Sequence, residues 1–280
     1  MENRDNLKLI YEENFETDLE LGDWYKADHP YKNIWAPLDT QLSSADPYNT
    51  KPCFLTPTNA FVKNGCLTLL ATEREDGYYG VEFRTHDFYS YGYFEIDAKI
   101  NTSRGICPAF WLLGSRDAAS KIEYEIDGFE CFGDTPNTIK CTLLAHSYPN
   151  GSKMPKAETV YQFEQYERLT DDLSPFAAHD SFFSGNWGEQ FHKFAVDWQP
   201  GMITWLVDEK PIYRVDTANS LGGKYPYNEP LKVILTIYSG RNICFPKTGI
   251  PDETTDWENG NSLKIKSIRF YEYDIQEKLK

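Results

Sequence analysis

Hydrophobic and polar residues alternate along most of this chain, in runs such as "YGYFEIDAKI" at 91–100 and "LKIKSIRFYEYD" at 263–274. Successive residues of a β-strand point to opposite faces of the sheet, so an alternating run predicts a strand with one buried face. Strand-like runs occur at 7–15, 66–72, 91–100, 108–114, 122–132, 138–148, 191–199, 202–208, 210–216, 231–238 and 263–274. Turn-forming clusters such as "EDGYYG" and "QPGM" separate these runs.

The order of these runs predicts an all-β protein. Many strands without intervening helices are typical of an antiparallel sandwich or barrel and not of a βαβ fold. We find no internal repeat and no low-complexity linker, so a single domain over residues 1–280 is expected. The segment 149–190 is rich in polar and turn-forming residues and is predicted to be a long loop insertion, which is where binding loops often lie.

The net charge of −15 disfavours two classes of partner. A surface this acidic repels phosphate backbones and anionic lipid headgroups, so neither nucleic acid nor a membrane is expected as a partner. The longest apolar runs, such as "VILTI" at 233–237, have the length of a strand and not of a membrane span. A monomer is expected.

The N-terminus "MENRDNLKLIYEENF" lacks the basic and apolar regions of a signal peptide. We expect a secreted or cell-surface protein whose leader is not part of this sequence, with a cytoplasmic protein as the alternative. The six cysteines form no CxxC pair, which argues against a zinc site and leaves free thiols or up to three disulfides open.

One predicted strand carries an unusual set of acids, in "KIEYEIDGFECFGD" at 121–134. Glu123, Glu125 and Asp127 share one face, and Glu130 falls on the other face of a regular strand. A β-bulge at Gly128 would insert one residue and return Glu130 to the face of Glu125 and Asp127. The sequence therefore predicts a bulge at Gly128, because it would place Glu125 and Glu130 on the same face, where the two carboxyl groups can act together.

Two carboxyl groups on one face suit the hydrolysis of glycosidic bonds. Retaining glycosidases hold a nucleophile and a general acid/base about 5–5.5 Å apart. Crowded carboxylates also separate in pKa, because like charges disfavour double ionisation. Two other interpretations are a solvated acidic edge and a calcium site, although the spacing lacks the EF-hand pattern.

Further motifs favour the catalytic interpretation. "EIDGFE" has the form E-I-D-x-x-E, which resembles the signature of glycoside hydrolase family 16. The stretches "GVEFRTHDFYSYGYFEIDAKINTSRGICPAFWLLG", "FHKFAVDWQPGMITWLVDEKPIYRV", "TTDWENG" and "LKIKSIRFYEY" resemble the same family in the same order. The resemblance covers about residues 9–274.

This resemblance implies a fold and an activity. The fold is a concanavalin A-like β-jelly roll, a sandwich of two curved antiparallel sheets with a sugar cleft on the concave face. The activity is endo-cleavage of a β-linked polysaccharide with retention, with Glu125 as nucleophile and Glu130 as general acid/base. Asp127 lies between them and helps to set their protonation states. The spacing is the bulged one of laminarinases, agarases and carrageenases, whereas the flanking sequence is closer to lichenases.

Five further residues match binding positions of the family. Trp111 matches a tryptophan under the cleaved sugar, with core packing as the alternative. Glu82 and Arg84 match cleft residues, with a structural salt bridge as the alternative. Trp257 matches a tryptophan at the cleft rim, and His146 lies where several members carry a cleft histidine.

Four positions depart from the family pattern, and one of them is Tyr124, which stands where the residue is often small or polar. Glu123 stands where a tryptophan is common, and Cys107 stands where a tryptophan often precedes the proline. Lys266 replaces an aspartate that many members use at a calcium site on the convex face, so no cofactor is expected and structural calcium is doubtful. These departures affect the substrate more than the chemistry.

The leading hypothesis is therefore a retaining endo-β-glycosidase of β-1,3- or mixed-linkage β-1,3-1,4-glucan. An endo-β-galactosidase-type enzyme of agar, carrageenan, porphyran or poly-lactosamine glycans is the first alternative. A non-catalytic carbohydrate-binding jelly roll is the second, since a fold does not fix a function.

Overall fold

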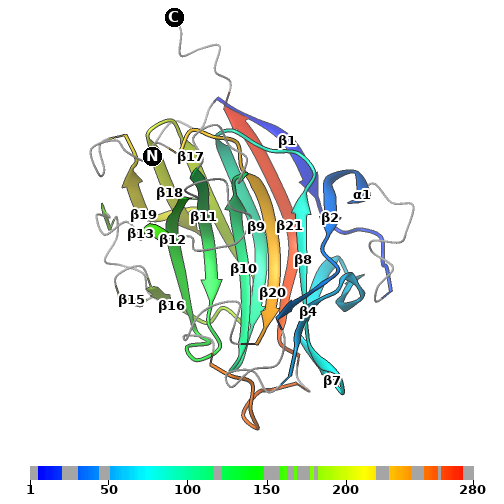
Figure 1. The fold of residues 1–280 in the computed structure, drawn as a ribbon. Coiled ribbons are helices and arrows are strands. Elements are labelled where there is room, and N and C mark those ends of the chain that lie inside the picture. Colours follow the sequence, from blue (N-terminus) through cyan, green and yellow to red (C-terminus); the bar gives the residue numbers. More distant parts are fainter. Residues whose placement is uncertain are drawn as a thin grey trace, which may run out of the picture.

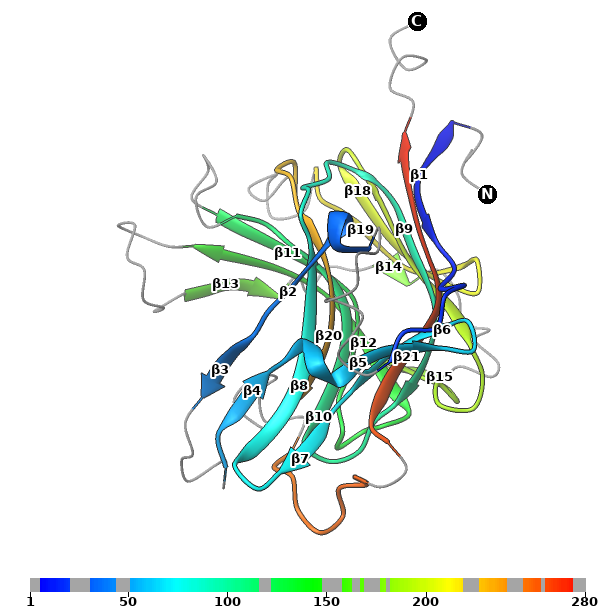
Figure 2. The ribbon, with the colours of Figure 1, turned by 90° about the vertical axis from the view of Figure 1, so that its right-hand side faces the viewer.

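The computed structural model describes residues 6–20, 31–43, 51–115, 122–147, 158–162, 167–168, 177–179, 182–218, 227–240, 249–257 and 260–273. In these residues two large β-sheets pack face to face as a β-jelly-roll sandwich. Figure 1 looks onto one sheet, and Figure 2 views the two curved layers from the side. The helical elements are one turn at α1 (Tyr31–Ile34) and a 3-10 turn at Pro57–Asn59.

The first sheet has the strand order β14–β19–β18–β17–β9–β21–β6–β5, with β1 also paired to β21. Its strands are β1 (Leu7–Glu13), β5 (Ala60–Lys63), β6 (Cys66–Leu70), β9 (Gly92–Asn101), β14 (Glu167–Arg168), β17 (His192–Gln199), β18 (Met202–Val207), β19 (Lys210–Asp216) and β21 (Ser262–Tyr273).

The second sheet has the order β15–β16–β12–β11–β10–β20–β8–β4–β3, with β13 paired to β12 and both β2 and β7 paired to β8. Its strands are β2 (Trp35–Pro37), β3 (Thr40–Ser43), β4 (Cys53–Leu55), β7 (Thr72–Arg74), β8 (Gly77–Thr85), β10 (Ile106–Leu113), β11 (Ile122–Cys131), β12 (Thr138–Ser147), β13 (Glu158–Gln162), β15 (Ala177–His179), β16 (Phe182–Ser184) and β20 (Lys232–Ser239). The pairings of both sheets are antiparallel except for β4 with β8.

All eleven alternating segments are strands, and their ends differ from the prediction by at most two residues. The second sheet contains a further central strand, β8, whose hydrophobic and polar residues alternate only weakly. Seven of its nine residues are buried, because its outer face is covered as well as its inner one. Tyr78 lies beneath Trp257 there, and Glu82 is 1% exposed.

The segment 149–190 differs from its prediction as a long loop. Four short strands, β13 to β16, lie within it. β13 and β16 both pair with β12, and β14 pairs with β19. These four strands extend both sheets, so the prediction of a loop is wrong for them, whereas residues 185–190 form turns and loop.

The core fills the space between the sheets and is strongly aromatic. Its largest fully buried side chains include Trp187, Trp198 and Trp205. The five described cysteines are free thiols, so the disulfide alternative does not hold for this part of the chain; Cys244 lies outside the described residues. No helix among the described ranges is long and apolar enough to span a membrane.

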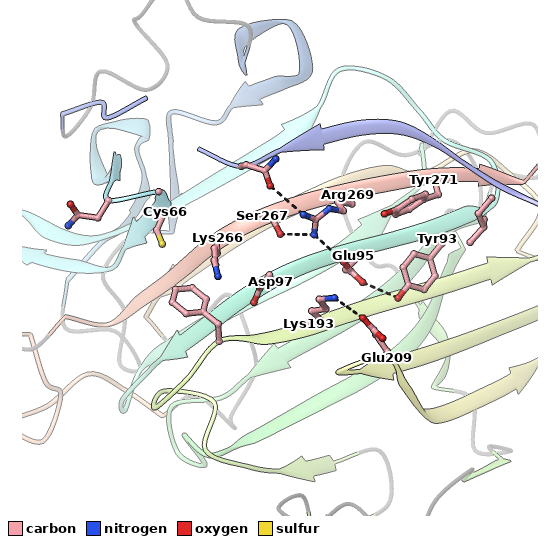
Figure 3. A pocket seen from close by; sticks show the side chains of 15 residues that line it. Cys66, Tyr93, Glu95, Asp97, Lys193, Glu209, Lys266, Ser267, Arg269 and Tyr271 are labelled. Carbon is pink, nitrogen blue, oxygen red and sulfur yellow. Dashed lines mark hydrogen bonds and ion pairs between the residues drawn. The ribbon is translucent and has the colours of Figure 1, made fainter. Parts of the chain in front are cut away.

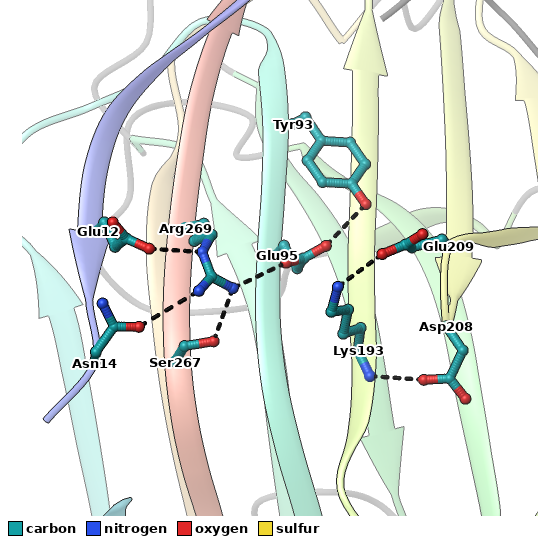
Figure 4. Close-up of polar contacts among 9 residues, drawn as sticks. All are labelled: Glu12, Asn14, Tyr93, Glu95, Lys193, Asp208, Glu209, Ser267 and Arg269. Carbon is teal, nitrogen blue, oxygen red and sulfur yellow. Dashed lines mark hydrogen bonds and ion pairs between the residues drawn. The ribbon is translucent and has the colours of Figure 1, made fainter. Parts of the chain in front are cut away.

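The outer face of the first sheet carries a polar groove with a volume of about 1030 Å³ (Figure 3). Arg269 on β21 holds neighbouring strands together across it, as Figure 4 shows. Its guanidinium donates to Glu12 of β1 at 2.8 Å and lies 3.5 Å from Glu95 of β9. Glu95 in turn accepts a hydrogen bond from Tyr93 at 3.1 Å. These hydrogen bonds and the ion pair connect β1, β21 and β9 across the groove.

The same groove contains Lys266, the position at which the resemblance implies an aspartate ligand of calcium. Lys266 lines this groove, as do Asp97 and Cys66 (Figure 3). An ammonium group has no lone pair for a metal and repels a divalent cation, whereas calcium takes six to eight oxygen ligands. No group of three or more His, Cys, Asp or Glu side chains in the described ranges could hold a metal ion. The residues present do not fit calcium.

Candidate active site

The acidic strand β11 contains the predicted bulge. Asp127 pairs with Thr142 of β12, and Glu130 pairs with Lys140, so three steps on β11 match two on β12. The pairing with β10 shows the same extra residue, because Phe110 faces Phe129 and the next residue of β10 faces Asp127. The prediction of a bulge is confirmed.

Gly128 is the extra residue, and the space around it explains why it is glycine. A Cβ atom at this position would lie 2.6 Å from Cδ1 of Phe110 and 3.0 Å from the Phe110 carbonyl oxygen. Both distances are far below van der Waals contact, so β10 approaches the bulge too closely for any side chain. The glycine is required by this approach and not by a left-handed backbone.

The bulge brings Glu125, Asp127 and Glu130 to the outer face of the second sheet. Ile126 and Phe129 both lie in the core, which places their neighbours on the opposite side. The charges of Glu125 and Glu130 both act on the carboxyl group of Asp127. The predicted convergence of the three acids on one face is confirmed.

Glu125 is held by a histidine from the next strand. His146 of β12 lies with Nε2 2.9 Å from Oε2 of Glu125. Both side chains are mostly buried, with exposed fractions of 16% for His146 and 17% for Glu125. An Nε2–H that donates here stabilises Glu125 as a carboxylate. His146 was expected to contact sugar, but in this structure it contacts the predicted nucleophile.

Asp127 is the most buried of the three acids. It is 2% exposed, and burial raises the pKa of its carboxyl group well above the usual range. The negative charges of Glu125 and Glu130 raise this pKa further, while Lys140 opposes them. The Oδ2 atom of Asp127 is buried and has no hydrogen-bond partner among the described residues. Glu125 has one described donor, His146, which favours its charged form.

The raised pKa of Asp127 makes the free energy of unfolding of the protein depend on pH. The folded pKa of Asp127 lies above its unfolded pKa of about 3.9, so the folded state binds the extra proton and loses stability as pH rises above about 4. Asp127→Asn removes this proton uptake and keeps a donor. We expect the free energy of unfolding of this variant, relative to that of the wild type, to rise from pH 4 to pH 7 by at most about 1.4 kcal/mol per pH unit.

Urea unfolding of both proteins at several pH values measures this difference. A difference in free energy of unfolding that does not change with pH would contradict a raised pKa of Asp127. Activity should fall in the same variant, because the amide of asparagine cannot release or take up a proton when the charge of Glu125 changes during the reaction.

Trp111 lies beside the acids, as predicted. It is the cross-strand neighbour of Asp127 on β10, and it faces outward because Phe110 and Leu112 lie in the core. Its Nε1 is buried and has no hydrogen-bond partner among the described residues. The hydroxyls of Thr142 and Thr236 on the same face are also buried without a described partner. Such unsatisfied groups are where water or a sugar hydroxyl would bind.

Glu82 and Arg84 of β8 lie on this face, three strands from the acids. Arg84 Nε donates to Glu82, and the hydroxyl of Tyr238 on β20 donates to the other oxygen of the same carboxylate. Glu82 is thus buried by its partners, while the Arg84 side chain is 36% exposed. The pair is a salt bridge that lies on the acidic face, and its contact with a sugar stays a prediction.

Trp257 lies away from the acids, at the far end of β8. Its ring stacks on Tyr78 with a centroid distance of 5.8 Å and an interplanar angle of 9°. Tyr78 alternates onto the face of Glu82, so Trp257 covers the end of the acidic face. This agrees with a position at the rim.

The sequence analysis missed two residues of this site. Tyr238 holds Glu82, and Lys140 pairs with Glu130. A signal existed for Tyr238, because Ile234, Thr236 and Tyr238 alternate with core residues of "VILTIYS" and so share the outer face. Lys140 could be placed only after the bulge had fixed the register of β11 against β12.

The geometry of the site agrees with comparisons to known proteins. The sequence profile of the glycosyl hydrolases family 16 matches residues 48–259. The chain is 26% identical over 225 residues to the endo-1,3-1,4-beta-glycanase ExsH of Rhizobium meliloti (strain 1021), which covers 76% of this chain and 39% of ExsH. It is 26% identical over 198 residues to a beta-glucanase of Rhodothermus marinus, covering 65% of this chain and 61% of that protein.

The fold also matches solved structures. The catalytic domain of an endo-1,3-beta-glucanase (laminarinase) from Thermotoga petrophila RKU-1 superposes with a TM-score of 0.65 at 24% identity, covering 96% of this chain and 98% of that one. Since the family profile covers three quarters of the sequence, this chain belongs to glycosyl hydrolases family 16.

Proposed function

We propose that this protein is a retaining endo-β-glycosidase of β-1,3- or mixed-linkage β-1,3-1,4-glucan. The observation that carries the proposal is the bulge at Gly128, which brings Glu125 and Glu130 to one face with the buried Asp127 between them. A strand of a sheet has no structural need for three carboxyl groups that crowd one another, since their repulsion opposes folding. A pair of carboxyl groups with separate protonation states is what a double displacement requires.

In this mechanism Glu125 attacks the anomeric carbon as a carboxylate, and Glu130 gives its proton to the departing oxygen. Water then cleaves the glycosyl–enzyme ester with Glu130 acting as base. His146 donates to Glu125, so it stabilises the carboxylate before attack and after release. As Glu125 becomes an ester its charge disappears, and the hydrogen bond from His146 weakens.

The substrate assignment rests on the relatives and on the outer face. The curated relatives are described as an endo-1,3-1,4-beta-glycanase and a beta-glucanase, and the matched solved structure as a laminarinase. Trp111 beside Asp127 offers a ring on which the apolar face of a sugar can stack. Arg84, whose side chain is 36% exposed, offers a polar contact on the same face.

Incubation with laminarin, barley glucan, agarose, carrageenan, porphyran and mucin glycans tests this proposal. We expect oligosaccharides from laminarin or barley glucan, released with a β configuration at the new reducing end. Cleavage of a galactan alone would favour the galactosidase alternative. Binding of glucan without products would favour the non-catalytic one.

We also propose that the fold needs no calcium, because Lys266 occupies the groove where the resemblance implied an aspartate ligand. Removal of divalent cations with EDTA should leave the melting temperature unchanged. A fall that added calcium reverses would contradict this proposal.

A further inference from the structure

Two backbone carbonyl groups at the bulge bond to side chains of the core. Trp205 Nε1 donates to the carbonyl oxygen of Asp127 at 2.7 Å, and Cys141 Sγ donates to that of Gly128 at 3.3 Å. Carbonyl groups of a regular strand lie in the sheet and bond to the neighbouring strands. A bulge interrupts this ladder, and a buried carbonyl left without a donor destabilises the fold.

The indole comes from the opposite sheet, across the core. Trp205 lies on β18 and is 1% exposed. Its ring packs on Tyr213 of β19 with a centroid distance of 4.9 Å, which fixes the direction of the N–H group. β19 has an extra residue at this point, because Trp205 pairs with Tyr213 but Leu206 pairs with Pro211. The bulge of the second sheet therefore accepts a hydrogen bond from Trp205, which lies beside an irregularity in the pairing of the first sheet.

The thiol comes from the neighbouring strand. Cys141 lies on β12 between the partners of Asp127 and Glu130 and is 1% exposed. Burial raises the pKa of this thiol well above its usual value. The group therefore keeps its proton and can donate it to the carbonyl oxygen of Gly128.

We propose that Trp205 and Cys141 are positioning residues that set the separation of Glu125 and Glu130. Neither side chain reaches the outer face, so both act through the backbone at residues 127 and 128. This inference rests on the proposed function. Its reason is that the separation of the two carboxyl groups decides whether Glu125 can attack, and a displacement of about 1 Å can cost 10²-fold in rate.

Trp205→Phe tests the indole, with Trp198→Phe as a matched control. Trp198 is equally buried, and its Nε1 also donates to a backbone carbonyl, that of Tyr227 at 2.9 Å. Both variants lose one hydrogen bond and the same volume, so both should melt at lower temperature. We expect only Trp205→Phe to lower kcat, by about tenfold or more with little change in KM, and to shift the pH profile of kcat.

Cys141→Ala tests the thiol, with Cys141→Ser as the conservative variant. The alanine leaves the Gly128 carbonyl without its donor and should lower kcat, whereas the serine hydroxyl can replace the thiol. Recovery of kcat in the serine variant supports the proposal. Equal kcat in Trp205→Phe and Trp198→Phe, or wild-type kcat and pH profile in Cys141→Ala, would overturn it.

A second measurement separates this inference from the proposed function. The wild type is first assayed on the glycan panel, and failure to cleave any member counts against the function alone. The carboxyl ¹³C resonance of Asp127 is then titrated by NMR without substrate. A changed titration in Trp205→Phe but not in Trp198→Phe supports the positioning role, and unchanged titrations in both overturn it.

Discussion

Replacement of Glu125 by glutamine should lower kcat on the cleaved glucan by about 10⁴-fold or more, because the amide cannot form the glycosyl ester. The side chain keeps its size and can still accept from His146, so binding of oligosaccharides should remain measurable by calorimetry. Glu123→Gln is the control, since Glu123 lies on the same face but has no assigned step. Unchanged turnover in Glu125→Gln would refute the assignment of the nucleophile.

Glu130→Gln should give a different pattern on two kinds of substrate. A general acid contributes about 10²–10⁴-fold, so cleavage of the polysaccharide should fall by that factor. An aryl glycoside whose leaving group needs no proton should still form the glycosyl–enzyme, visible as a burst of phenol. Glu125→Gln should show no burst on either substrate. Identical behaviour of the two variants would mean that the roles are not divided in this way.

Gly128→Ala should destabilise the protein and impair catalysis together. A methyl group would collide with both the ring and the carbonyl oxygen of Phe110, at 2.6 and 3.0 Å. Overpacking of this kind costs about 1–3 kcal/mol, and relief would require β11 to move away from β10. That movement would displace Glu130 relative to Glu125, so kcat should fall more than KM changes. Urea unfolding and steady-state kinetics measure the two effects.

The double variant Gly128→Ala/Phe110→Leu identifies the cause. Phe110→Leu alone removes a ring from the core and should cost stability. If the collision with the ring is the reason for glycine, the double variant should be more stable than the sum of the two single changes predicts. Simple additivity would show that the effect of Gly128→Ala arises elsewhere.

The site shows where sequence reasoning succeeds and where it stops. The face shared by Glu125, Asp127 and Glu130 could be inferred because a strand has period two and one inserted residue corrects the register. The resemblance pointed to Trp111 and His146, and both lie beside the acids. It could not show that His146 contacts Glu125, because that contact depends on the stagger of β12 against β11.

By itself, the sequence predicted an all-β protein of antiparallel strands, because alternation is a local property of the chain. The shared face of the acids required in addition a bulge at Gly128, which the pairing of β11 with β12 confirmed. Only the tertiary structure decided that Asp127 is buried and that Phe110 closely approaches Gly128. Burial of Asp127 and the approach of Phe110 depend on residues from other strands, as do the hydrogen bonds from Trp205 and Cys141. Such contacts leave no periodic signal in the sequence, because they join positions as far apart as Asp127 and Trp205.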